Sequence, residues 1–116
     1  ISGGKYHKQK KKTKDNLPGI ERKVKLRTEK QKTLRTMGGN KKNVLLSTQE
    51  ANIINPETKK ATKTKIKNVL ETPSNRFSAR QNLLLKSAII ETELGKARIT
   101  NRPSQEGMVQ AVLIKE

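Results

Sequence analysis

Residues 87–100 read SAIIETELGKARIT. Two runs rich in aliphatic and β-branched residues, 87–92 and 97–100, flank a short polar segment, which is typical of a β-hairpin. We expect Gly95 to supply the positive φ that a tight turn needs. We also expect Ile90 to be buried in the core of the sheet. The segment from 91 to 116 has balanced charges, so the best-formed part of the core is predicted to lie there.

Further short strands are predicted on the N-terminal side of this hairpin and after it. They are residues 23–27, 44–48, 51–54, 59–70 and 108–114, with turns at 55–58, 72–75 and 101–107. Residues 23–27 alternate basic and aliphatic side chains, which predicts one buried and one cationic face, and the Thr/Lys ladder of 59–70 predicts a strand with a solvated basic face. Strands spaced by about ten residues argue for a small barrel or sandwich. Residues 75–82 are expected to form one helical turn or a structured loop, with Phe77 as a core anchor. We therefore predict a mainly β fold, with a small β-barrel-like body of short strands and a long basic, extended N-terminal arm.

Composition bounds the function of the chain. With 116 residues there is room for one domain. The 27 Lys and Arg residues against 10 Asp and Glu give a net charge of +17, which suits a polyanionic partner. There is no Cys and one His, so we expect no metal site and no cofactor. No apolar run reaches the roughly 18–20 residues that span a bilayer, and we expect no membrane partner and no secretion leader.

The positive charge is concentrated near the N-terminus. Residues 1–43 carry 15 of the basic residues and 3 of the acidic ones. The run KYHKQKKKTK at 5–14 has no apolar periodicity, so we expect it to be disordered when free and to order only against phosphate. A plain solvated or targeting tail is the alternative. Residues 1–22 are therefore predicted to be a basic RNA-binding arm, and 23–116 a single barrel-like domain. Since the chain begins with Ile1, we expect a few native residues to precede it.

Candidate nucleic-acid contacts share positive charge, a flexible glycine or a stacking ring. Gly38 and Gly39 would let the backbone approach a phosphate, with two cations following at once, although a glycine turn with ordinary lysines explains the same residues. Arg76 and Arg80 would share a face if their segment is helical. The predicted contacts are Lys5, Tyr6, His7, Lys8, Lys10, Lys11, Lys12, Lys14, Arg22, Lys23, Lys25, Arg27, Arg35, Gly38, Gly39, Asn40, Lys41, Lys42, Arg76, Arg80 and Arg102.

Catalysis has no support in these residues. Glu91 and Glu93 are expected on one side of a strand, where they would resemble a carboxylate pair, but they lack a histidine partner and an apolar pocket. We expect them to be surface charges, paired with Lys96 and Arg98 across the hairpin. The only histidine, His7, would have no orienting partner in a flexible arm. We therefore expect no enzyme activity and no small-molecule substrate.

Several motifs occur in an order that is more specific than any one of them. They are SGGK at 2–5 before the basic run, GGNKK at 38–42, NRFSAR at 75–80, AIIET at 88–92, GKA at 95–97 and RP at 102–103 followed by Gly107. In this order they resemble ribosomal protein S8e, in its short archaeal form. The chain departs from that family at NLPG, 16–19, where a Gly-Arg-Pro element is common. It also has RPSQ at 102–105 in place of Arg-Pro-Gly-Gln, which suggests that position 104 needs no positive φ.

The resemblance implies a structural constituent of the small ribosomal subunit, working in the cytoplasm within the ribosome. It implies that residues 5–14 of the arm and the segment 38–42 contact small-subunit ribosomal RNA, with neighbouring small-subunit proteins as further partners. The alternative is a non-ribosomal basic nucleic-acid-binding protein, either an RNA chaperone or a DNA-compacting protein. A basic adaptor for an acidic protein is disfavoured, because few proteins match the extended charge density of RNA.

Overall fold

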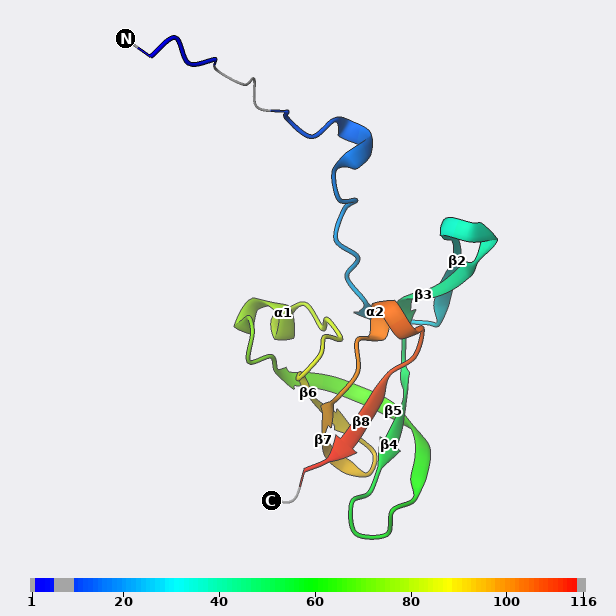
Figure 1. Ribbon diagram of the computed structural model, residues 1–116. Coiled ribbons are helices and arrows are strands. Elements are labelled where there is room, and N and C mark those ends of the chain that lie inside the picture. The colour runs from blue at the N-terminus through cyan, green and yellow to red at the C-terminus, as the bar shows by residue number, and fades with distance from the viewer. Residues whose placement is uncertain (1, 6–9, 115–116) are drawn as a thin grey trace.

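Five strands close into a barrel, which confirms the predicted β-barrel body (Figure 1). The computed structural model describes residues 2–5 and 10–114. The barrel strands are β4 (Glu50–Ile54), β5 (Ala61–Glu71), β6 (Ile89–Thr92), β7 (Gly95–Ile99) and β8 (Gln110–Leu113). Successive strands pair antiparallel from β4 to β8, and β8 closes the barrel by pairing parallel to β4.

The barrel interior alternates large and small aliphatic side chains. Ile90 lies opposite Ala97 in the β6–β7 ladder, and Ala111 lies opposite both Ile99 and Ile53. All five side chains are buried. Small barrels fill their interior in this way, because the strands leave little room between facing side chains. The hairpin of 87–100 and the burial of Ile90 are confirmed, with Gly95 at φ 122° directly after the turn.

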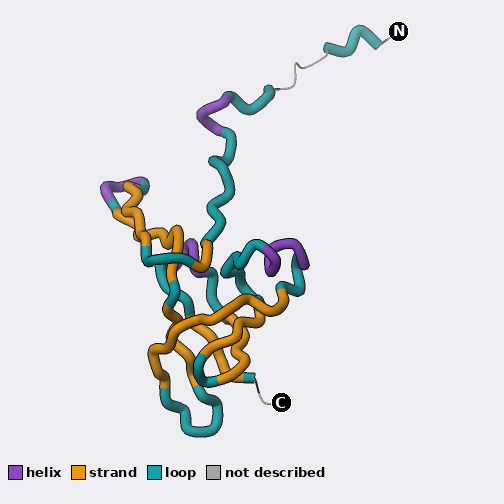
Figure 2. Tube along the Cα trace, turned by 180° about the vertical axis from the view of Figure 1, so that it is seen from behind, coloured by secondary structure: helices purple, strands orange, loops and turns teal. Residues whose placement is uncertain are grey.

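A second, three-stranded sheet stands on the barrel. It consists of β1 (Lys25–Leu26), β2 (Lys30–Arg35) and β3 (Lys41–Thr48) in the order β1-β3-β2. The strands β2 and β3 form a hairpin that projects from the body, and β3 leads almost directly into β4 (Figures 1 and 2). The strand β2 was not predicted. Its first four residues are exposed on both faces, so burial imposes no period-two alternation on its sequence.

The start of the folded body is held by the core and by hydrogen bonds to residues 82–84. Val24 is buried in the barrel's apolar core. Its carbonyl accepts from the Leu84 N–H at 2.9 Å, and the Leu26 N–H donates to the Asn82 carbonyl at 3.1 Å. Lys23, Lys25 and Arg27 are exposed while Val24 is buried and Leu26 half-buried. The predicted alternation of basic and aliphatic side chains is therefore confirmed.

Two short helices occupy the links between strands. The helix α1 (Arg76–Arg80) confirms the helical alternative for residues 75–82. The helix α2 (Pro103–Glu106) lies within the segment predicted as a long turn, and it ends at Gly107, whose φ is 76°. Proline at the first helical position and glycine after the last explain why so short and polar a segment is helical.

Two expectations about side chains were wrong. Phe77 is not a core anchor, since 53% of its surface is exposed on α1. The core cluster consists of alanine, valine, leucine and isoleucine side chains instead. Glu93 lies in the two-residue turn between β6 and β7 rather than on a strand beside Glu91. Glu91 does lie opposite Lys96, whereas Arg98 lies opposite Ile89.

Candidate nucleic-acid interface

The tip of the β2–β3 hairpin is a tight turn built on two glycines. Gly38 and Gly39 have φ values of 75° and 76°, which side chains with a Cβ rarely adopt. The Thr36 N–H donates to the Asn40 carbonyl at 2.7 Å, and the Asn40 side-chain amide donates to the Met37 carbonyl at 3.2 Å. The predicted glycine turn is thus present, and it presents exposed backbone and an exposed amide at the far end of the hairpin.

Positive charges crowd this hairpin. Arg35 lies directly opposite Lys41 across the ladder, and like charges in such a pair destabilise a sheet. Lys30 and Lys32 are also exposed on β2. Lys42 differs from its neighbours, because it is half-buried and its ammonium contacts the side-chain oxygen of Gln105 on α2. An anion placed at the tip would relieve the repulsion between the exposed cations.

The helix α2 ties the hairpin and the end of the arm to the barrel. Arg22 donates from Nε to Ser104 Oγ at 3.1 Å, and Gln31 donates from Nε2 to the Gly107 carbonyl at 3.3 Å. Ser104 lies inside α2 and is not among the described residues with positive φ, as the sequence suggested. Arg102, at the N-terminal boundary of α2, is exposed. Two of the predicted contacts, Arg22 and Lys42, therefore also hold the fold together.

A buried asparagine organises the loop that carries α2. The Asn101 side-chain amide donates to Glu106 Oε2 at 3.0 Å and to the Met108 carbonyl at 2.7 Å. Its oxygen accepts from the Gln110 N–H at 3.0 Å. These bonds fix both ends of the 101–110 segment against each other, so Asn101 adds to the contacts that hold α2 in place.

The N-terminal segment runs away from the barrel (Figure 1). Lys5, Lys10, Lys11, Lys12 and Lys14 are exposed, and one 3₁₀ turn, η1 (Lys14–Asn16), interrupts the segment. The pKa of the Asp15 carboxyl is lowered by a hydrogen bond to the Thr13 side chain, with its own backbone N–H adding to the effect. The predicted contacts Tyr6, His7 and Lys8 lie outside the described residues.

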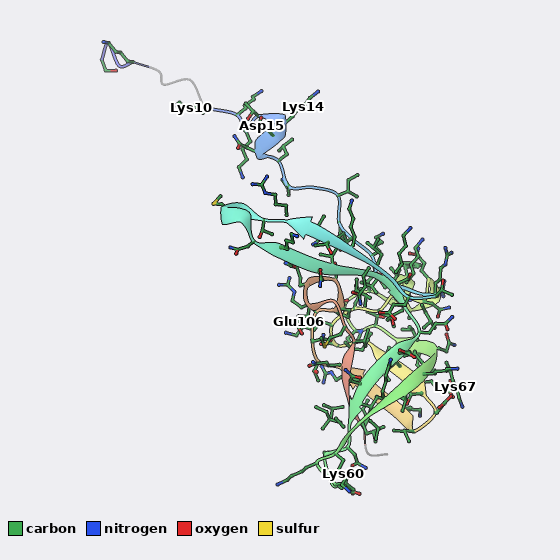
Figure 3. The ribbon with its side chains drawn as sticks, turned by 90° about the vertical axis from the view of Figure 1, so that its right-hand side faces the viewer. Lys10, Lys14, Asp15, Lys60, Lys67 and Glu106 are labelled. Atoms are coloured by element: carbon green, nitrogen blue, oxygen red, sulfur yellow. The ribbon has the colours of Figure 1, made fainter. Side chains whose placement is uncertain are left out.

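Another basic surface was only partly foreseen. Lys63, Lys65 and Lys67 alternate along the outer side of β5, as the predicted solvated basic face requires, but they were not among the predicted contacts. Lys63 pairs with Glu50, which raises the pKa of the Lys63 ammonium. Figure 3 shows Lys60 at the opposite end of the molecule from Lys10 and Lys14, and Lys67 at the side of the barrel. The Thr/Lys alternation of 62–67 was the signal that could have identified this surface.

The described residues hold no group of three or more potential metal ligands. No helix in the described part of the chain is both long and apolar enough to cross a membrane. What the described surface does offer is exposed ammonium and guanidinium groups on a hairpin, a strand face and an outlying segment. These features define a small basic barrel protein whose surface suits a polyanion.

Comparison with known proteins gives the family. The family model described as Ribosomal protein S8e matches residues 1–114. The small ribosomal subunit protein eS8 of Sulfurisphaera tokodaii is 44% identical over the whole chain and 91% of its own length. The protein of the same name from Methanococcus aeolicus is 43% identical over 99% of the chain and 91% of its own length. That from Hyperthermus butylicus is 51% identical over 72% of the chain and 61% of its own length. The chain belongs to the ribosomal protein S8e family, as its ordered motifs predicted.

Proposed function

We propose that this protein is a structural component of the small ribosomal subunit, in the cytoplasm, and that it binds and stabilises folded ribosomal RNA. Its relatives carry the name small ribosomal subunit protein eS8. Neighbouring small-subunit proteins are the other partners in this proposal. The protein would act by positioning and neutralising RNA phosphates, and not by catalysis.

The observation that carries the proposal is the separation of the basic residues from the core. The core cluster of the barrel consists of aliphatic side chains, while most cations of the β2–β3 hairpin and those of residues 10–14 are exposed to solvent. Extended cationic segments of this kind reach phosphates that a globular surface cannot, and each contact releases condensed counterions. The fold therefore serves as a support that holds charged segments at fixed places.

The proposal divides the chain into two functional parts. Residues 1–22 form an RNA-binding arm that is disordered when free, and residues 23–116 form the folded body. Val24 entering the core and Arg22 contacting Ser104 support a boundary at this point. Recognition is expected to depend on shape and phosphates, because A-form RNA hides its base edges in a deep, narrow groove.

The first experiment asks whether the protein prefers small-subunit RNA. The full chain is mixed with archaeal small-subunit ribosomal RNA and an excess of bulk DNA, and bound RNA is measured. Retained RNA binding supports the ribosomal proposal, whereas complete displacement by DNA supports a non-specific nucleic-acid-binding protein. Sedimentation of lysate through sucrose at high salt checks the same point, since a ribosomal component should migrate with the small subunit.

The second experiment tests the arm with matched charge changes. Lys10→Gln with Lys11→Gln removes two charges from the arm, and Lys59→Gln with Lys60→Gln removes two from the loop at the opposite end. If both arm lysines contact phosphates, the slope of log K against log salt falls in magnitude by about 1.4–1.8 for the first pair. The second pair should leave the slope nearly unchanged. Equal slopes for the two double variants would refute a specific role for the arm.

A further inference from the structure

Phe77 is an exposed aromatic ring in a chain that has almost none. It is the only phenylalanine, and 53% of its surface is accessible. Burying such a side chain would stabilise a protein considerably, so leaving it in solvent forgoes that contribution. The stability of the core therefore does not explain why the Phe77 side chain is exposed.

The short helix that carries the ring holds it outward. Asn75 Oδ1 accepts from the Phe77 N–H at 2.9 Å, which fixes the start of α1. The next residue, Ser78, is buried, and its carbonyl accepts from the Leu83 N–H at 3.0 Å. Ala79 packs against the core cluster. Because Ser78 and Ala79 anchor the inner side of α1, its first two residues and Arg80 remain outside.

Two guanidiniums lie close to the ring. The Cζ atoms of Arg76 and Arg80 are 5.4 Å and 5.6 Å from the centroid of Phe77, within the range of cation–π contact. Neither arginine forms an ion pair with a carboxylate in the described part of the chain. Like charges four residues apart on a helix repel each other. The cluster thus combines a flat apolar ring with two uncompensated positive charges.

A groove of about 520 Å³ adjoins this cluster. Arg76, Ala79 and Arg80 of α1 line it together with Asn82 and with residues 68–72 at the end of β5, which include one carboxylate, that of Glu71. Phe77 lies beside the groove and is not part of its lining, while Asn68 and Asn82 contribute amide groups. A nucleotide has a π-face, polar base edges and a phosphate. The planar groups, amides and positive charges of this site can bind these three features in turn.

We propose that Phe77, Arg76 and Arg80 form a stacking site for an unpaired RNA base. The Phe77 ring would stack on the base, and the guanidinium of Arg76 or Arg80 would hold an adjacent phosphate. Paired bases in an A-form helix do not expose their faces, so the occupant is a nucleotide of a loop, bulge or end. An acidic peptide would satisfy the two charges but would not use the ring. This inference rests on the proposed RNA-binding function and names one part of its binding surface.

The test uses the full chain and a short oligouridine that carries one 2-aminopurine, whose fluorescence falls when the base stacks. Phe77→Ala removes the ring, Phe77→Leu keeps apolar bulk without a π-face, and Phe77→Tyr keeps an aromatic ring. Leu94→Ala is the matched control, because Leu94 is 51% exposed in the turn between β6 and β7. Thermal unfolding of each variant by circular dichroism verifies that the body is folded, which is expected for substitutions of exposed side chains.

We expect Phe77→Ala and Phe77→Leu to weaken binding of the single-stranded probe roughly ten-fold and to abolish its quenching. Phe77→Tyr and Leu94→Ala should behave like the original protein, and a fully paired RNA duplex should bind all variants alike. Equal affinity of Phe77→Leu and the original protein, or equal losses for the probe and the duplex, would overturn the stacking site. Binding of polyglutamate that depends on Phe77 as strongly would assign the site to a protein partner. If the original protein binds no RNA at all, the proposed function itself fails.

Discussion

The contact between α2 and β3 can be tested at a single glycine. Gly107 ends α2 with φ 76°, and a Cβ built there would lie 3.3 Å from the backbone oxygen of Asn43 on β3. Gly39 at the hairpin tip has the same φ, but a Cβ there meets nothing within 4 Å. Alanine at either position adopts an unfavourable left-handed conformation. Only at Gly107 does it also press against backbone.

The expected losses of stability follow from these two terms. The left-handed conformation costs alanine about 1–2 kcal/mol, and roughly 0.4–1 kcal/mol is regained because alanine restricts the unfolded chain. Gly39→Ala should therefore reduce the free energy of unfolding by about 0–1.6 kcal/mol. The tight contact at Gly107 adds overpacking of about 1 kcal/mol. Relief of that contact would move α2 and strain the Gln31 bond to the Gly107 carbonyl.

Urea unfolding followed by far-ultraviolet circular dichroism measures both variants, since the chain has no tryptophan to report by fluorescence. We expect Gly107→Ala to have the lower midpoint, with the slope against urea unchanged in both. Equal midpoints for the two variants would show that α2 does not press on β3, and the described packing beneath the hairpin would then be wrong.

Three further substitutions test the core, the α2 loop and the arm. Ile90→Asp should unfold the body at 25 °C, because it places an unpaired charge at a fully buried position; an unaltered melting curve would contradict the assigned strand face. Asn101→Ala removes three hydrogen bonds from a buried side chain and should lower the free energy of unfolding by about 2–3 kcal/mol, measured in urea. Thr13→Ala should raise the pKa of the Asp15 carboxyl in an NMR titration, since the Thr13 hydrogen bond lowers it. An unchanged pKa would show that this hydrogen bond does not stabilise the Asp15 carboxylate.

Predictions from sequence succeeded where one face of a strand is buried. The hairpin 87–100, the burial of Ile90 and the exposed lysines of β5 all follow from alternation that burial imposes. The strand β2 escaped prediction because its residues KQKTLR face solvent on nearly every side. The helix α2 carried readable signals in Pro103 and Gly107, but four residues are too few to show a helical period.

The candidate site was predictable in its charge and not in its geometry. Composition alone indicates a polyanion partner, and Gly38 and Gly39 do form the expected turn. Phe77 was misplaced because phenylalanine is usually buried, whereas in α1 the neighbouring Ser78 and Ala79 face the body and Phe77 lies on the outer side. The second role of Lys42, against Gln105, depends on a helix that was not foreseen.

The exposed strand β2 has a consequence for the protein before it meets any partner. It lies at the edge of its sheet in the described structure, so its outer backbone groups could pair with a strand of another copy. Lys30, Lys32 and Arg35 line that edge, and two such edges repel each other. Newly made chains can therefore accumulate without joining edge to edge, and neutralising these three cations would be expected to promote self-association.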